Sequence, residues 1–307
     1  MDPRVFIVIV VYKRLELTKA CLDSLRKQTY NNYKVIVVDH CENDEQTIKY
    51  ISEHMPEVDV LKGTDDMWWT AATNFAIHHV LDKHNPILDR DLILTLNNDL
   101  TVPDDYLEQL IHTYQTFDEK TMVGSVSLYA NQNGLVDFAG CVWNKVSTRV
   151  RSIFKSNVSY SEIRDLGSVN SDLLPGRGTL FPAILLSQIG FYDADNFPHY
   201  ASDYDFSHRA RLFGYRLVVS TKAYLKSAVG ETGIRFDKNA NAVPTLRYFW
   251  LTQTSIKSPI NFRTRFNWAK KHTRVPLIYF SIDSMRVVFS YLNYTRNYYK
   301  KSIRWNM

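Results

Sequence analysis

The chain reads Leu92-Ile93-Leu94-Thr95-Leu96-Asn97-Asn98-Asp99, an apolar run of strand length that stops abruptly at two amides and a carboxylate. In an α/β protein, ligands bind just beyond the carboxyl ends of the parallel strands. A carboxylate flanked by amide oxygens at that point suits a hard divalent cation that holds a diphosphate, because Mg²⁺ and Mn²⁺ prefer oxygen ligands. The same residues also suit an ordinary turn between a strand and a helix. The rest of the sequence is needed to distinguish a binding site from a turn.

Strand and helix patterns alternate around this stretch. Buried apolar runs predict strands at 5–11, 35–38, 58–61 and 92–96. Apolar residues at helical spacing predict helices near 15–25, 45–53 and 69–81. This alternation predicts the α/β class, with a mostly parallel, open sheet flanked by helices.

The pattern changes after Pro103. The sequence there predicts, in order, a helix near 106–110, strands at 122–128 and 136–143, a polar loop near 156–171, a helix near 203–212 and a strand at 215–220. From Pro244 onward the chain is helical, basic and aromatic in pattern. We therefore expect one catalytic domain over residues 1–240 and a helical extension over 241–307.

Composition and charge indicate the cellular compartment in which the protein is expected. The 307 residues carry a net charge of +5 and only three cysteines, which lack metal-ligand spacing and favour a reducing compartment. Neither a signal peptide nor a membrane-spanning segment is recognisable. These features predict a cytoplasmic protein, and no nucleic-acid partner is expected.

Two turns carry candidate binding groups. Tyr12-Lys13-Arg14 follows the first strand where a glycine-rich phosphate loop would stand, which argues against dinucleotide oxidoreductases and P-loop enzymes. A diphosphate would then be held by metal and side chains. Asp39 ends the second strand, where a carboxylate can bind a ribose or a base N–H or can simply cap the loop.

Two helix starts are equally suggestive. The segment from Asp65 to Asn74 contains a tryptophan pair followed by small residues, which suits either stacking on a ligand ring or a plug in the core. Asp203 and Asp205 precede a helix at a spacing that puts them on different faces. A helix N-terminus keeps a carboxylate ionised and able to accept a proton, although an N-cap role explains at least one of the two.

Taken in order, these segments resemble the family 2 inverting glycosyltransferases of the GT-A fold, which move a sugar from a nucleotide-diphosphate donor to a hydroxyl. The resemblance runs from about Val5 to Gly233. The motifs that carry it are Tyr12-Lys13-Arg14, Val37-Val38-Asp39, Trp68-Trp69 with Asn74, Asn97-Asn98-Asp99, Pro175-Gly176-Arg177-Gly178, and Asp203-Tyr204-Asp205 with Arg209 and Gly214. It implies a nucleotide-binding half over residues 1–100 and an acceptor half over 101–240.

The resemblance also implies roles for individual residues. Asp203 would be the general base, and Asp99 would be the metal ligand that ends the Asp-x-Asp motif. The residues expected around the nucleotide sugar are Val11, Tyr12, Arg14, Asp39, Asp66, Trp69, Asn74, Asn97 and Asn98. The residues expected to support the acceptor side and its helix are Arg177, Gly178, Tyr200, Asp205 and Arg209.

The chain departs from the family pattern at three places. Asn97 stands where the motif has its first Asp, and Ser202 stands where a Glu precedes the base. Residues 229–233 read Val-Gly-Glu-Thr-Gly where a metal-assisting histidine is often found. The implied cofactor is thus Mn²⁺ or Mg²⁺, bound weakly.

The expected activity is that of a hexosyltransferase in polysaccharide assembly, acting on a glycan or lipid-linked saccharide. A sugar-phosphate nucleotidyltransferase and a non-catalytic glycan- or nucleotide-binding module are the alternatives. The aromatic and basic segment 275–307 suits an interfacial helix on the inner face of an anionic membrane. It equally suits a helix that packs on the catalytic domain or on a second copy in a homodimer.

Overall fold

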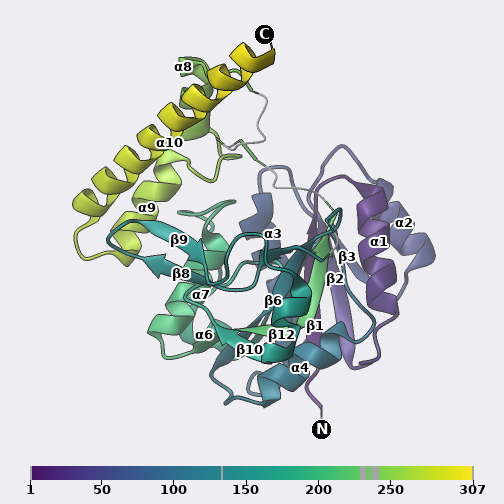
Figure 1. The fold of residues 1–307 in the computed structure, drawn as a ribbon. Helices are drawn as coiled ribbons and strands as arrows, with labels where there is room; N and C mark the ends of the chain where they lie inside the picture. The colour runs from purple at the N-terminus through teal and green to yellow at the C-terminus, as the bar shows by residue number, and fades with distance from the viewer. Residues whose placement is uncertain (1, 133, 229–232, 235, 237–241, 306–307) are drawn as a thin grey trace. The chain divides into compact units, whose positions relative to one another are not determined.

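The structure is a computed structural model that describes residues 2–132, 134–228, 233–234, 236 and 242–305, with side chains described as far as Lys300. It contains two compact units (Figure 1). The first comprises Met1–Val142, Arg151–Asp193 and Ser202–Gly230, and the second comprises Trp143–Val150, Ala194–Ala201 and Glu231–Met307. The predicted domain boundary after residue 240 lies outside the described residues and stays a prediction.

The first part of the sheet is parallel, as the alternating pattern predicts. Its strands, in spatial order, are β3 (Asp59–Lys62), β2 (Tyr33–Asp39), β1 (Val5–Val11) and β4 (Leu92–Asn97). The connecting helices are α1 (Leu15–Arg26), α2 (Gln46–His54) and α3 (Trp68–His79), the last continued by the π-helical turn η1 (Val80–His84).

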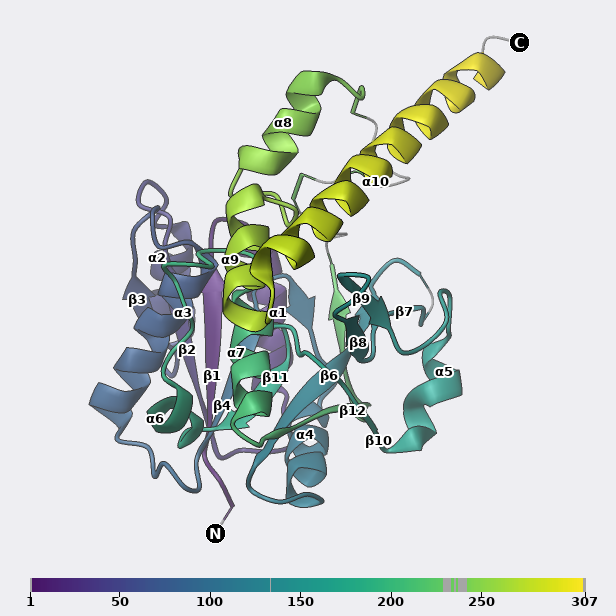
Figure 2. The same ribbon diagram turned by 90° about the vertical axis from the view of Figure 1, so that its left-hand side faces the viewer.

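Helices cover both faces of this sheet. The odd-numbered residues of β1 pack into one core with Leu22 and Leu25 of α1 and Ile51 of α2, and the even-numbered residues are buried on the other face. Figure 2 shows α3 and α7 (Ser202–Leu212) in front of the sheet, with α1 and α4 (Tyr106–Gln115) behind it. Burial on both faces explains why the β1 sequence is continuously apolar.

The second part of the sheet is mixed rather than parallel. β11 (Thr179–Pro182) lies antiparallel between β4 and β6 (Thr121–Tyr129), and β12 (Arg216–Ser227) runs parallel to β6. The short strands are β5 (Leu100–Thr101), β7 (Val136–Phe138), β8 (Cys141–Asn144), β9 (Arg149–Ser152) and β10 (Ser168–Asn170). The sheet keeps the expected open form, flanked by helices.

The expected polar loop near 156–171 contains regular structure. It holds α5 (Tyr160–Ile163), the 3-10 turn η2 (Arg164–Leu166) and β10. Helix α5 begins with a capping box, in which the Ser159 backbone N–H donates to Glu162 Oε1 at 2.8 Å. A short helix, α6 (Leu185–Ile189), follows β11.

The second unit contains helices α8 (Leu246–Thr254), α9 (Phe262–His272) and α10 (Pro276–Trp305). Arg265 of α9 donates to Asp283 of α10 at 2.8 Å and to Gln253 of α8 at 2.8 Å, and all three side chains are buried. This buried network ties the three helices together. Among the described residues, no helix combines the length and apolar character needed to cross a bilayer.

Candidate active site

The carboxyl ends of the parallel strands meet at one edge of the sheet. The strand register pairs Val11 with Asp39 and Val10 with Asn97. Asp99 follows two residues after Asn97, and its backbone carbonyl accepts a hydrogen bond from the N–H of Ala228 at 2.9 Å. The register therefore brings three of the predicted donor-binding residues to the edge at which open α/β sheets bind ligands.

The turn after β1 aims a guanidinium at Asp99. Lys13 and Arg14 both have left-handed backbone angles, with φ of 61° and 63°. Such angles are costly for residues other than glycine, so the surrounding structure must hold them. Asn98 does so, because its buried amide donates to Thr18 Oγ1 at 2.9 Å and to the Lys13 carbonyl at 3.4 Å.

Arg14 and Asp99 form an ion pair at this corner. Arg14 Nη1 lies 3.3 Å from Asp99 Oδ2. Burial raises the pKa of the Asp99 carboxyl above its ordinary value, although the positive charges of Arg14 and Arg177 oppose the shift. The corner thus offers one carboxylate and one half-exposed cation to a bound diphosphate or metal ion.

The edge beside β2 combines a buried carboxylate, Asp39, with a partly exposed aromatic residue, Tyr12. Asp39 is almost completely buried, and its Oδ1 accepts a hydrogen bond from the backbone N–H of Cys41 at 3.1 Å. Burial raises the pKa of Asp39, while the Cys41 N–H and the charge of Lys62 lower it. The ring of Tyr12 lies 5.0 Å from that of His40, Lys13 Nζ lies 5.6 Å from the centroid of the Tyr12 ring, and Tyr12 as a whole is 44% exposed.

Trp69 connects this edge to the helix that carries Asp203. Its Nε1 donates to Asn97 Oδ1 at 3.2 Å. Its ring lies against Gly176, where an added Cβ would come within 2.5 Å of two indole carbons. The backbone N–H of Gly176 in turn donates to Asp203 Oδ2 at 2.8 Å. A side chain at residue 176 would therefore separate the tryptophan from the carboxylate.

Asp203 itself is held by backbone donors at the start of α7. Besides Gly176, the N–H of Tyr204 donates to its Oδ1 at 2.9 Å. Burial raises the pKa of Asp203, and the two backbone N–H groups and the charge of Arg177 oppose the shift. Each oxygen retains a lone pair, so the carboxylate can accept a proton from a bound hydroxyl.

Asp205 has a different environment two residues later. It is fully buried, and Arg209 Nε donates to its Oδ2 at 2.8 Å, the pairing that their spacing along the helix favours. Arg209 also donates to the backbone carbonyls of Ile189 and Phe191. These bonds brace α7 against the end of α6 and the segment that follows it.

Gly178 and Arg177 shape the loop before β11. Gly178 has φ of 78°, and a Cβ there would lie within 3.0 Å of Leu225, Ser125 and Tyr106. Arg177 Nη2 donates to Asp137 Oδ2. Asp137 was not identified from the sequence, because a single acid in a short strand carries no recognisable signal.

Three predicted site residues have other surroundings. Asn74 is bound in both directions to the backbone of Tyr192, at 2.8 and 3.1 Å, so it holds the loop that touches the Trp69 ring. Asp66 accepts a hydrogen bond from Thr64. Tyr200 belongs to the second unit, where its ring lies 4.6 Å from that of His199. Of residues 229–233, only Gly233 lies within the described part of the chain.

Comparisons with known proteins identify the family and the fold. The model of the family described as "Glycosyl transferase family 2" matches residues 6–159, and that of "Glycosyl transferase family group 2" matches residues 92–305. No curated protein matches the chain.

Two solved structures are similar in fold. A crystal structure of GalNAc-T7 with UDP, GalNAc and Mn²⁺ has a TM-score of 0.61 at 13% identity, over 88% of this chain and 50% of that one. A crystal structure of S. aureus TarS has a TM-score of 0.50 at 14% identity, over 88% of this chain and 44% of that one. The chain therefore spans half the length of these structures or less.

Proposed function

The chain belongs to glycosyl transferase family 2, and we propose that it transfers one hexose from a nucleotide-diphosphate donor to a hydroxyl with inversion at the anomeric carbon. The observation that carries this proposal is the contact path from Asn97 through Trp69 and Gly176 to Asp203. It links the candidate donor edge to a carboxylate able to act as a base.

The proposed reaction is a single displacement. The acceptor hydroxyl loses its proton to Asp203 while its oxygen forms a bond to the anomeric carbon. The bond between that carbon and the diphosphate oxygen breaks, and the nucleotide diphosphate leaves with the electron pair. Arg14 supports the negative charge that develops on this leaving group, an electrostatic role for which its position beside Asp99 suits it.

A divalent cation fits the residues present. GalNAc-T7 was crystallised with Mn²⁺, and here Asp99 with the amide oxygen of Asn97 would hold the ion. Mg²⁺ and Mn²⁺ commonly use one or two carboxylates together with substrate phosphates, so a single acid is enough. When bound, the ion would supply further positive charge to the diphosphate.

Thermal-shift and turnover assays with a panel of nucleotide sugars test the proposal. We expect one donor to raise the melting temperature. We also expect transfer from that donor to a glycan or lipid-linked acceptor to release nucleotide diphosphate. Release of pyrophosphate would instead indicate a nucleotidyltransferase. Donor binding without turnover on any acceptor would indicate a binding module.

We further propose that the second unit binds an anionic lipid surface from the cytoplasmic side, where it would meet a lipid-linked acceptor. Its apolar side chains that are more than half exposed include Leu246, Trp250, Phe262, Leu277, Ile278, Met285, Phe289 and Leu292. Exposed basic residues of the same unit include Arg263, Lys270, Arg274, Arg296 and Lys300. Apolar and basic groups together match an anionic membrane interface.

A cavity in the same unit supports this reading. It has a volume of about 650 Å³ and is lined mainly by apolar side chains, among them Phe249, Ile256, Val287 and Val288. The apolar lining would suit the lipid part of a lipid-linked saccharide, and Arg263 and Arg265 of the same lining would suit its phosphate part.

Vesicle binding by the full chain tests the lipid proposal. We expect it to co-sediment with anionic vesicles in low salt, and Leu277→Ser with Phe289→Ser to weaken binding several-fold, because both apolar groups are lost from the interface. Leu212→Ser is the control, since Leu212 is 69% exposed in the first unit. Absence of binding, or conversion of a dimer to a monomer by the double variant, would reassign the surface to protein contact.

A further inference from the structure

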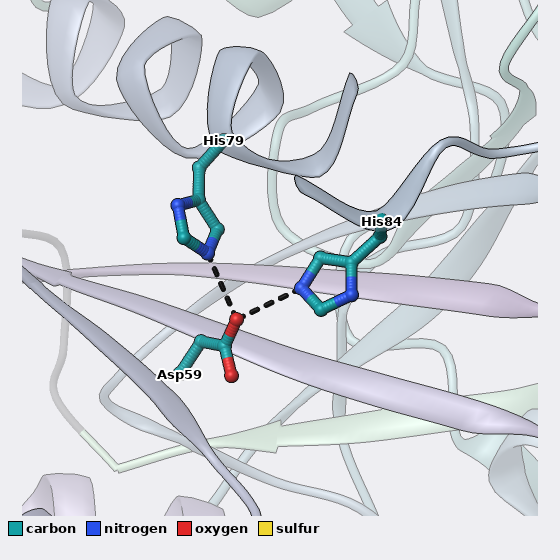
Figure 3. Close-up of side chains that lie close together, drawn as sticks. All are labelled: Asp59, His79 and His84. Atoms are coloured by element: carbon teal, nitrogen blue, oxygen red, sulfur yellow. Dashed lines mark hydrogen bonds and ion pairs between the residues drawn. The ribbon is translucent and has the colours of Figure 1, made fainter. Parts of the chain in front are cut away.

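Three side chains of types that can ligate a metal ion converge at a place remote from the candidate active site. Asp59 begins β3, His79 ends α3 and His84 ends η1. The Nε2 atoms of both histidines lie 2.8 Å from the same oxygen, Asp59 Oδ2 (Figure 3). One ligand atom from each residue can be chosen so that all lie within 4.8 Å of one another.

The π-helical turn explains how the second histidine reaches this point. His79 and His84 are five residues apart, and in an α-helix such residues point about 140° away from each other. A π-helical turn hydrogen-bonds residues five apart and so brings them to the same side. π-helical turns are rare in proteins, and those that do occur are often found at functional sites. Here the turn directs both imidazoles at one carboxylate.

A third donor fixes the orientation of the Asp59 carboxylate. Lys34 Nζ lies 2.7 Å from Oδ1 and leaves Oδ2 to the histidines. Such an outer partner fixes the orientation of a ligating carboxylate.

The cluster is separate from the Asp99 corner. Asp59 pairs with Ile36, three residues before Asp39 at the carboxyl edge, which corresponds to about 10 Å along the strand. His79 lies ten residues after Trp69 on the same helix, which corresponds to about 15 Å. An ion at Asp59 therefore has no part in binding the donor diphosphate.

We propose that Asp59, His79 and His84 form a binding site for a transition-metal ion of the zinc class. Two imidazole nitrogens and one carboxylate oxygen select zinc or its neighbours over Mg²⁺ and Ca²⁺, which prefer all-oxygen sites. On binding, each Nε2 exchanges its bond to Oδ2 for a bond to the metal, and its proton moves to Nδ1. Water completes the tetrahedral set.

The ion would clamp β3 to the end of α3. Because the other end of α3 carries Trp69, the clamp stabilises the half of the sheet on which the candidate donor edge is built. The proposal concerns binding and stability alone, and it stands whether or not the chain transfers sugars.

Titration calorimetry on chelator-treated, full-length protein without nucleotide tests the site. We expect Zn²⁺ to bind with a stoichiometry of about one and to raise the melting temperature by about 5 °C when present at a hundred times its Kd. Co²⁺ in the same site should give the visible absorption of a tetrahedral centre. Mg²⁺ at the same concentration should give no binding heat at this site and no rise in the melting temperature.

Matched variants locate the ion. His79→Ala and His84→Ala should each weaken Zn²⁺ binding about tenfold or more, whereas His112→Ala, an exposed histidine of α4, and Asp99→Asn should not. If circular dichroism shows that an alanine variant is unfolded, His84→Gln keeps a hydrogen-bonding group without a zinc ligand and is used instead. Zinc affinity unchanged in both histidine variants, or absent from the wild type, would overturn the proposal.

Discussion

Carboxylates at the two ends of the parallel strands differ in the direction of their pKa shift and in their number of hydrogen-bonding partners. At the carboxyl edge, burial raises the pKa of Asp39 and Asp99, and each has few hydrogen-bonding partners. Toward the other end, Asp59 is surrounded by three donors and its pKa is lowered. We expect carboxylates with few partners and a raised pKa to bind substrate, and carboxylates with several donors and a lowered pKa to stabilise the fold.

Helix α7 shows the same contrast over two residues. Asp203 has a raised pKa and accepts hydrogen bonds from the backbone N–H groups of Gly176 and Tyr204, while Asp205 is paired with Arg209. If the contrast reflects function, carboxylates of the first kind should affect catalysis when changed, and those of the second kind should affect stability.

The largest effect is expected at Asp203. Asp203→Asn should lower kcat by about 10²–10⁴ because a general base is lost, while the affinity for the nucleotide sugar is retained. Asp205→Asn is the matched control and should lower the free energy of unfolding by about 3 kcal/mol, since it breaks a buried ion pair. Steady-state kinetics and urea denaturation of both variants measure this, and more than a tenth of the wild-type kcat in Asp203→Asn would rule out its role.

The pH profile sharpens the same prediction. A base works only when deprotonated, so kcat/KM should rise with pH through the pKa of Asp203 and become flat above it. Because burial raises that pKa, the midpoint should lie above the ordinary aspartate value of about 4. An acid limb at or below that value would show that another group titrates.

A smaller effect is expected at Asp99. Asp99→Asn should lower kcat/KM on the order of a hundredfold, because the leaving diphosphate loses part of its electrostatic support. It should also abolish the dependence of nucleotide affinity on Mn²⁺, as measured by calorimetry. The control is Asp23→Asn, an exposed aspartate of α1. A variant with unchanged Mn²⁺-dependent affinity would remove Asp99 from the metal site.

Asp39 should affect binding more than turnover. Asp39→Ala should raise the KM for the donor about tenfold, the loss of one charged hydrogen bond, with kcat nearly unchanged because base and ribose contacts persist in the transition state. Glu53→Ala, on the exposed face of α2, should change neither constant. A fall in kcat larger than the rise in KM would place Asp39 nearer the reacting atoms.

The sequence predicted those strands and site residues whose signal is local, and it missed those whose partners lie far away along the chain. The strands of the parallel half were recognisable because each is buried on both faces and reads as a continuous apolar run. β11 was missed, since Thr179-Leu180-Phe181-Pro182 is short and its antiparallel pairing depends on distant strands. Asp137 and the Asp59 cluster were missed for the same reason, as their partners lie 40, 20 and 25 residues away.

The smallest effect on activity is expected at Asp59. This carboxylate tests whether a group with several donors and a lowered pKa affects stability rather than catalysis. Asp59→Asn should lower the free energy of unfolding by about 2 kcal/mol at pH 7 through loss of charged hydrogen bonds, yet leave kcat and the donor KM within twofold. The folded-state pKa lies below the unfolded value, so this stabilisation is present above about pH 4 and is lost as the pH falls through the folded pKa. Urea midpoints of wild type and variant, measured with chelator present, should therefore converge on acidification. If Asp59→Asn changed the donor KM more than the stability, the two ends of the strands would not differ in the way that their surroundings indicate.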